Sequence, residues 1–144
     1  MSQKDVDLVL RWYAFLPDLA NAEATDDQTI LDQAFRDYLD EEYEVRLPGD
    51  YPEGEVAFRG REGLVRFAAM LRDIWSEWRF EPERCIDAGD RVVVFMRVVA
   101  KGKESGVPLE QRNTQVVTLR DRLITSTRVY RDRGEALKAV GLDE

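Results

Sequence analysis

The stretch FRGREGLVRF, residues 58–67, has the residue types that most directly suggest chemistry. Gly60 and Gly63 stand three positions apart among three arginines. A glycine-rich turn that opens a helix can bind an anion through its free backbone N–H groups. A phosphate loop often carries a lysine, however, and here Glu62 occupies the first helical turn, where an anion would lie. We therefore predict a strand-to-helix corner at Gly60, with its arginines mostly on the surface, in place of a phosphate site.

Histidine is absent from the chain of 144 residues. This excludes the mechanisms that activate a serine or cysteine with imidazole, and the usual zinc and iron sites that contain histidine. A general base would have to be a carboxylate, a tyrosine or a lysine. Cys85 is alone, so it can form neither an intrachain disulfide nor a thiolate metal cluster, and we interpret it as a small buried side chain.

Acidic residues form two clusters, one at Asp26 and Asp27 and one at residues 40–42. Neither cluster has the spaced ligands or the glycine hinge of a calcium loop. Both lie at predicted helix ends, where we interpret them as solvated charge. The sequence therefore predicts no metal site, and we expect no cofactor.

The overall charge bears on possible partners. The formal net charge of -8 and the pI of about 4.7 argue against nucleic acid and anionic membranes, since both need a basic protein face. The sequence has no apolar run long enough for a membrane helix, and its start, MSQKDVDLVL, lacks the features of a signal peptide. We expect a cytoplasmic protein with one domain over residues 1–144.

The first half of the chain predicts three helices. Residues 6–19 are apolar on two helical faces, which is typical of a buried helix. Residues 28–39 carry one apolar stripe, with Asp27 as a suitable N-cap. A third stripe runs from Leu64 through Trp75 to Trp78.

The second half changes to a period of two, which predicts strands. The expected strands are residues 43–47, 78–86, 91–101, 109–119 and 123–132, followed by a short helical segment at 134–142. Both faces of residues 91–101 are largely apolar, so something should cover each face. The fold class predicted is α+β, with helices packed on one face of a curved antiparallel sheet.

The order of these elements and the strings FRGREGLVRF, DAGDRVVVFMRV and RVYRDRGEALKAVGL resemble the SnoaL-like branch of the nuclear-transport-factor-two-like superfamily. The resemblance covers nearly the whole chain. It implies a cone, in which a strongly bent antiparallel sheet wraps around three N-terminal helices and leaves a pocket at the open end. It also implies a homodimer through the convex face of the sheet. A second copy would cover Val93, Phe95 and Val99, although the chain's own terminal segment is an alternative cover.

Ketosteroid isomerases of this superfamily use a tyrosine on the first helix, a carboxylic acid on a late strand and an aspartate before a proline. The resemblance places Trp12, Gln115 and Leu47 at these three positions. Gln115 can still donate a hydrogen bond, but Leu47 cannot act as a base. Tyr13 lies about 100° around the helix from Trp12, so it would serve only if the match slips by one residue.

Other catalytic sets of the superfamily are also incomplete in this sequence. The limonene-type epoxide hydrolases use Arg-x-Asp on one strand, a pattern absent from this sequence, and their last-strand aspartate corresponds to Val129. The cyclases rely on a late-strand carboxylate that the match does not supply, and the scytalone-dehydratase type needs histidine. The resemblance therefore implies the cone without its familiar catalytic residues.

Without these catalytic residues, the predicted pocket has an uncharged wall. If Gln115 faces inward, two-residue alternation turns Asn113 and Gln111 inward as well, so that three amides line one wall. Such amides either pair with one another and water or hold the polar groups of a ligand. The predicted ligand-binding residues are Trp12, Leu47, Asn113, Gln115, Thr127 and Val129. An apolar wall with a few hydrogen-bonding groups is typical of a small-molecule site.

Two functions are consistent with this wall. The first is a binding protein for a small apolar or amphipathic molecule. The alternative is an enzyme of the polyketide-cyclase, ketosteroid-isomerase or epoxide-hydrolase kind with relocated acid–base residues, which would need a carboxylate in the cavity near Gln115. Asp50 and Glu53 are the nearest candidates for that base. The sequence leaves open whether Arg97 faces the pocket or the dimer interface.

Overall fold

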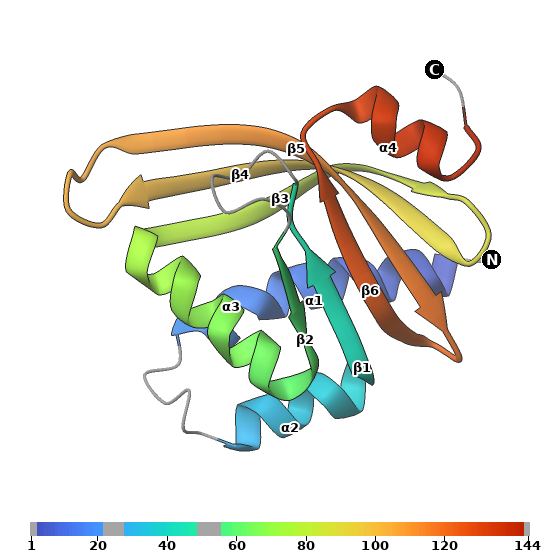
Figure 1. Ribbon diagram of the computed structural model, residues 1–144, viewed down its shortest axis with the longest axis horizontal. Coiled ribbons are helices and arrows are strands. Elements are labelled where there is room, and N and C mark those ends of the chain that lie inside the picture. The colour runs from blue at the N-terminus through green and yellow to red at the C-terminus, as the bar shows by residue number, and fades with distance from the viewer. Residues whose placement is uncertain (1–2, 22–27, 49–55, 143–144) are drawn as a thin grey trace.

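The computed structural model describes residues 3–21, 28–48 and 56–142. The elements follow in the order α1 (Gln3–Asn21), α2 (Gln28–Asp37), β1 (Leu39–Arg46), β2 (Ala57–Arg59), α3 (Gly60–Ile74), β3 (Trp75–Asp87), β4 (Arg91–Gly102), β5 (Pro108–Arg120), β6 (Leu123–Tyr130) and α4 (Arg133–Ala139) (Figure 1). The predicted N-cap Asp27 lies outside the described residues. None of the described helices is long and apolar enough to span a lipid bilayer.

The six strands form one sheet in the order β2-β1-β6-β5-β4-β3. All neighbouring strands are antiparallel except β1 and β6, which run parallel. A parallel pair needs a long crossover, and here α3 and four strands lie between its members. The sheet is strongly bent and does not close into a barrel (Figure 1). The α+β prediction is confirmed, with one parallel pair that the sequence did not predict.

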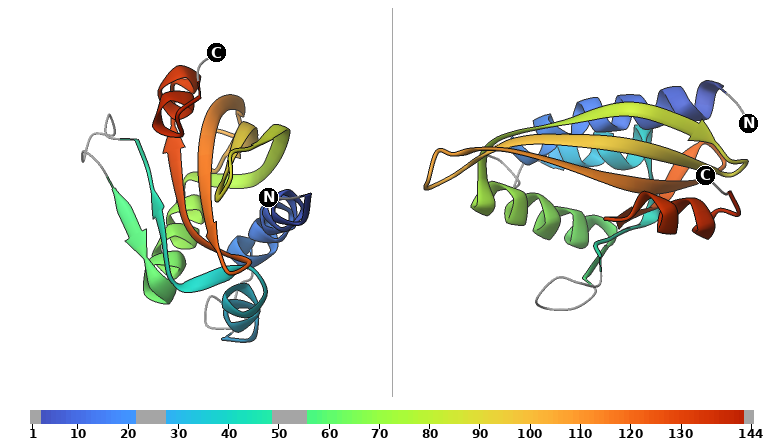
Figure 2. Two further views of the ribbon diagram at one scale, coloured as in Figure 1. Left: turned by 90° about the vertical axis from the view of Figure 1, so that its right-hand side faces the viewer. Right: turned by 90° about the horizontal axis from the view of Figure 1, so that it is seen from above.

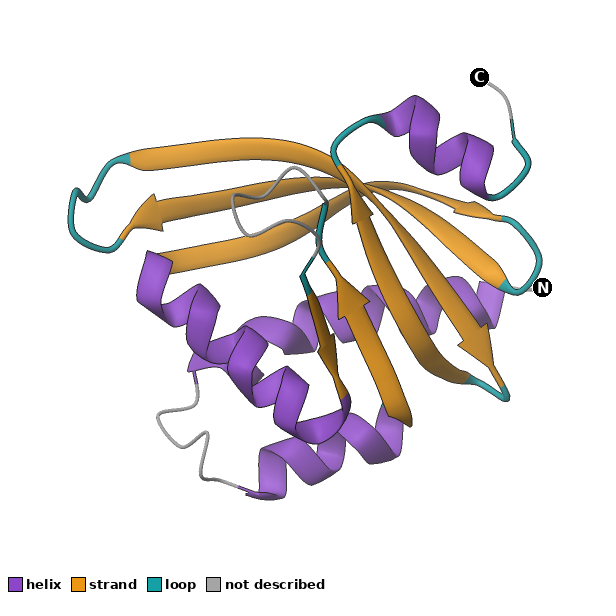
Figure 3. Cartoon of the chain, in the orientation of Figure 1, coloured by secondary structure: helices purple, strands orange, loops and turns teal. Residues whose placement is uncertain are grey.

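The helices lie on both sides of the bent sheet. α1, α2 and α3 occupy its concave side, whereas α4 lies across the convex side (Figures 2 and 3). The main core fills the space between the three helices and the concave face. Apolar residues on both predicted faces of α1 enter this core, among them Val9, Trp12 and Leu16. This burial explains why the helix carries apolar residues on two of its faces.

The FRGREGLVRF stretch forms the corner between β2 and α3. Arg59 is extended and Gly60 has a φ of +66°, in the left-handed region that favours glycine. A Cβ at Gly63 would lie 2.7 Å from the carbonyl carbon of Phe58, so this position needs glycine to let the helix approach the strand. The predicted corner at Gly60 is confirmed, and it brings α3 under the sheet.

The predicted end of the third helix was wrong. The stripe was expected to continue through Trp78, but α3 ends at Ile74, whose side chain is 50% exposed. Trp75 and Trp78 lie in β3, where they pair with Gly102 and Ala100 of β4. Tryptophan suits a half-buried strand well, and here the ladder with β4 prevails over the helical spacing.

The second apolar face of β4 is covered by the chain itself. Val93 and Phe95 are buried together with Ala136 and Leu137 of α4, while Val99 is half-buried. For Val93 and Phe95 the structure thus shows the alternative cover, which is the chain's own terminal segment. A homodimer remains a prediction.

Arg97 faces the same convex side. Its guanidinium forms ion pairs with Glu81 of β3 and with Glu110 of β5, at 3.0 Å for the latter. Arg97 is not among the described residues that line the pocket beneath the sheet. The open question about Arg97 is thus answered in favour of the outer face.

Candidate functional site

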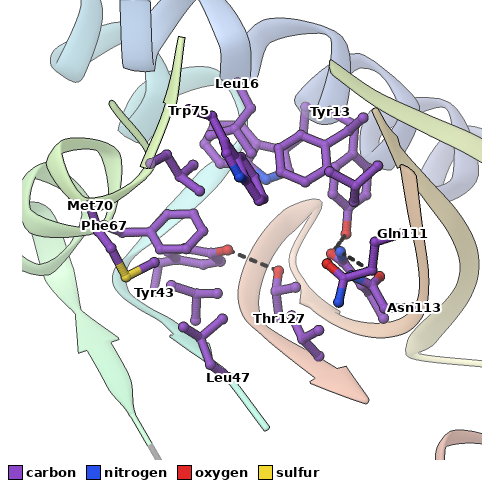
Figure 4. A pocket seen from close by; sticks show the side chains of 17 residues that line it. Tyr13, Leu16, Tyr43, Leu47, Phe67, Met70, Trp75, Gln111, Asn113 and Thr127 are labelled. Atoms are coloured by element: carbon purple, nitrogen blue, oxygen red, sulfur yellow. Dashed lines mark hydrogen bonds between the residues drawn. The ribbon is translucent and has the colours of Figure 1, made fainter. Parts of the chain in front are cut away.

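A cavity of about 80 Å³ lies between the helices and the concave face of the sheet. Side chains from α1, α3 and five of the strands line it (Figure 4). The structure brings all six predicted site residues to this cavity, namely Trp12, Leu47, Asn113, Gln115, Thr127 and Val129. Gln111, the third predicted amide, lines it as well.

A chain of three hydrogen-bonding side chains forms one corner of the cavity (Figure 4). The hydroxyl of Tyr13 donates to Oε1 of Gln115 over 2.5 Å. The Nε2 group of Gln115 then donates to Oδ1 of Asn113 over 3.1 Å. Asn113 and Gln115 are two residues apart on β5 and therefore share one face of the strand. We call Tyr13, Gln115 and Asn113 the amide corner.

Tyr13 was missed as a site residue, although the sequence contained a signal for it. The family match placed Trp12 at the position of the catalytic tyrosine, and Tyr13 would replace it only with a slip of one residue. In the structure Trp12 packs in an aromatic cluster, with ring centroids 5.8 Å from Tyr38 and 6.2 Å from Tyr43. The rotation of about 100° per residue turns Tyr13 toward β5 instead.

A second polar pair lies on another wall of the cavity. The hydroxyl of Tyr43 donates to Oγ1 of Thr127 over 2.9 Å (Figure 4). The pair depends on the parallel register of β1 and β6, in which Val45 lies opposite Thr127. Because Thr127 accepts this bond, its own hydroxyl hydrogen can still be donated.

The electrostatic environment keeps both phenols neutral. Burial raises the pKa of Tyr13 well above its ordinary value. Burial also raises the pKa of Tyr43 and outweighs the hydrogen bond to Thr127, which acts in the opposite direction. At neutral pH both side chains therefore act as hydrogen-bond donors and acceptors and carry no charge.

Apolar side chains make up the rest of the lining. Val129 comes from β6 and Leu47 directly follows β1, while Phe67 and Met70 come from α3. All the described residues that line the cavity are uncharged at neutral pH. The composition suits an apolar molecule held by a few neutral hydrogen bonds.

The alternative of an enzyme required a carboxylate in this cavity. No aspartate or glutamate is among the described lining residues, and Asp50 and Glu53 lie outside the described part of the chain. Within residues 3–21, 28–48 and 56–142, no group of three or more cysteine, aspartate or glutamate side chains is placed to hold a metal ion.

Comparison with known families and structures gives a consistent result. A family model described as a SnoaL-like domain matches residues 20–127. An NTF2-like protein from Burkholderia xenovorans is similar in structure, with a TM-score of 0.64, 20% identity and 90% of each chain covered. A putative SnoaL-like polyketide cyclase from Jannaschia sp. has a TM-score of 0.66 at 18% identity, covering 100% of this chain and 98% of its own.

A third similar structure is that of TerC co-crystallised with polyporic acid. It has a TM-score of 0.68 at 19% identity and covers 96% of this chain and 98% of its own. The structural matches show a shared fold. Sequence identities this low leave the activity of the chain open. The search of curated proteins found no match.

Proposed function

Because the chain belongs to the SnoaL-like domain family with the NTF2-like cone fold, we propose that it binds a small, neutral, mainly apolar molecule that carries one hydrogen-bond acceptor. The fold supports a small-molecule-binding or polyketide-cyclase-type protein. The observation that carries the proposal is the direction of the hydrogen bonds in the amide corner.

The bonds in this corner all run toward Asn113. Tyr13 uses its hydrogen on Gln115, and Gln115 uses one amide hydrogen on Asn113. The Oδ1 atom of Asn113 is thereby occupied as an acceptor, while its Nδ2 group donates to no side chain or backbone atom in the described part of the chain. A ligand oxygen such as that of a ketone would satisfy this donor. We therefore assign the ligand an acceptor group at Asn113.

The volume of the cavity bears on the size of the ligand. At about 80 Å³ it is smaller than the roughly 150 Å³ cavity that holds benzene in another protein. A one-ring ligand would therefore require lining side chains to move. Met70 is half-buried and has the flexible side chain that adapts most readily to such a change. A molecule with one ring and a short polar group is the size class that we propose.

Binding fits the described groups better than proton transfer does. A general base works best when its pKa lies near the working pH. The titratable side chains at the cavity are Tyr13 and Tyr43 among the described residues, and the pKa of each is raised. These groups can hold a ligand but are poorly suited to accept a proton at neutral pH. The co-crystal of TerC with polyporic acid is an observation on that protein, and it agrees with small-molecule binding as a role of this fold.

A matched pair of probes tests the proposal. Acetophenone and ethylbenzene have nearly the same shape, but only acetophenone carries an acceptor oxygen. Titration followed by two-dimensional NMR should show acetophenone binding about fivefold more tightly, which is the value of one net neutral hydrogen bond. The near-isosteric variant Asn113→Leu should remove this difference. Gln33→Leu changes an amide on α2 outside the cavity, and it should retain the difference.

A charged probe gives the opposite test. Benzoate should bind much more weakly than acetophenone, because an uncharged pocket does not compensate a buried carboxylate. Equal affinities of acetophenone and ethylbenzene in the unaltered protein would overturn the assignment of an acceptor. Failure of both neutral probes to bind, or tighter binding of benzoate, would overturn the proposal itself.

A further inference from the structure

A second hollow, of about 200 Å³, lies on the convex face of the sheet beside the start of α4. Phe95 and Thr114 are among its lining residues, together with Arg112, Arg131 and Arg133. Thr114 is located between Asn113 and Gln115 on β5, so its side chain points away from the ligand pocket. The hollow therefore lies on the opposite face of β5 from the ligand pocket, and Asn113 is a lining residue of both.

Arg133 is held by an aromatic ring. The centre of its guanidinium lies 3.9 Å from the centroid of Phe95. Stacking of this kind fixes the plane of the guanidinium and leaves the N–H groups at its edge available. Arg133 forms no ion pair with a residue in the described part of the chain. It is thus a positioned cation whose donors are available to a ligand.

Thr114 supplies a second, independent observation. Its side chain lines the hollow and the residue is only 3% exposed. Its hydroxyl nevertheless makes no hydrogen bond with any described residue. The hydroxyl itself is accessible from the hollow, because Nε1 of Trp78 is the fully buried side-chain donor left without a partner among the described residues. A ligand oxygen in the hollow would give the Thr114 hydroxyl an acceptor.

The charge around the hollow favours an anion. Three arginines and one carboxylate, that of Glu83, line it, whereas the whole chain has a formal net charge of -8. Arg112 is held by Glu83 over 3.0 Å and by Glu110 over 3.2 Å, which places it at the rim. With Glu110 included, three arginines and two carboxylates surround the hollow, so its charge is slightly positive in a chain whose net charge is negative.

We propose that this hollow binds a small phosphate-class oxyanion, either as the free ion or as a phosphomonoester. A tetrahedral anion can accept charge-assisted hydrogen bonds from Arg133 and Arg112 on different oxygens and one more from the Thr114 hydroxyl. We call Arg133, Thr114 and Arg112 the outer anion site. It shares β5 with the ligand pocket but uses the opposite face of the strand.

Phosphate titration at constant ionic strength tests the proposal, with isothermal calorimetry and ³¹P NMR as measurements. The variant Arg133→Gln should weaken phosphate binding by about tenfold, the loss expected for one charge-assisted hydrogen bond. The isosteric Thr114→Val should weaken it by about fivefold, as removal of a neutral hydrogen bond does. Acetophenone binding should stay unchanged in both variants, which shows that the protein is folded and that the two sites are distinct.

Two matched variants serve as controls. Arg79→Gln changes another outward arginine that pairs with Glu81, and Thr118→Val changes another threonine of β5. Neither residue lines the hollow, so both variants should bind phosphate as the unaltered protein does. Phenyl phosphate that binds more tightly than phosphate would identify a monoester, and equal affinity would identify the free ion. Absence of saturable binding, or equal weakening by Arg79→Gln and Arg133→Gln, would overturn the proposal.

Discussion

The hydroxyl of Tyr13 lies 2.5 Å from the amide oxygen of Gln115, and 102 residues separate the two in the sequence. The bond joins α1 to β5 inside the cavity. It fixes which atom of Gln115 faces the tyrosine, and therefore which atom of Asn113 is left for a ligand. The polarity of the proposed site thus rests on a contact between the first helix and a late strand.

The variant Tyr13→Phe removes this bond and keeps the ring. The Gln115 oxygen is then buried without its partner, and we expect a loss of about 1–3 kcal/mol in the free energy of unfolding. Urea unfolding followed by circular dichroism measures the loss. Tyr130→Phe is the control, since the Tyr130 hydroxyl makes no hydrogen bond with a described residue. A loss of the same size in both variants would contradict a special role for the Tyr13 bond.

Stability should fall at alkaline pH. Because the pKa values of Tyr13 and Tyr43 are raised in the folded state, the folded protein holds protons that the unfolded chain releases above about pH 10. The contribution of these two protonated tyrosines to the free energy of unfolding is complete below about pH 10. It is lost as the pH rises toward their pKa values in the folded protein. Each tyrosine contributes a slope of about 1.4 kcal/mol per pH unit. Urea unfolding at a series of pH values should give a shallower slope for Tyr43→Phe, and an unchanged slope would refute the assignment.

The contact between α4 and the sheet should be important for stability. Leu137 is buried against Val93 and Phe95, so Leu137→Ala should lower the free energy of unfolding by about 2–4 kcal/mol. Lys138→Ala, on the exposed side of the same helix, should change it by less than about 0.5 kcal/mol. Thermal unfolding of both variants measures the difference. Equal melting temperatures would mean that α4 contributes no packing energy.

The homodimer implied by the family resemblance can be tested through its salt dependence. With Val93 and Phe95 covered, a second copy would meet a convex face rich in ion pairs, such as that of Arg97 with Glu110. Salt screens exposed charges, and the screening length falls from about 10 Å at 0.1 M to about 3 Å at 1 M. Sedimentation equilibrium should therefore show a dimer that weakens as salt is added. A monomer at micromolar concentration in low salt would contradict the prediction.

Much of the fold could be predicted from the sequence because it depends on periodicity. Two-residue alternation correctly predicted that Asn113 and Gln115 share one face of β5. The first helix, which is apolar on two faces, was correctly predicted to pack in the core. Alternation is a local property, and it survives errors of one or two residues in the ends of an element. The uncharged wall of the cavity could be predicted for the same reason.

The missing parts of the site depend on geometry that periodicity does not contain. Choosing Tyr13 over Trp12 requires the rotation of α1 about its axis, which a slip of one residue changes by about 100°. The contact between Tyr43 and Thr127 requires the register of two parallel strands far apart in sequence. Trp75 fits a helical stripe by spacing alone, and only the ladder with β4 assigns it to a strand, whereas Trp78 fits both the stripe and the predicted strand over residues 78–86.

The position of α4 has a consequence for the newly made chain. During synthesis β4 is made before β5 and β6, and α4 is made after all three strands. Until α4 has emerged from the ribosome, Val93 and Phe95 lack the helix that covers them. Exposed apolar strands of this kind invite aggregation and chaperone binding. The segment that protects the outer face of the sheet is thus translated after all the strands of that sheet, so burial of Val93 and Phe95 has to wait for it.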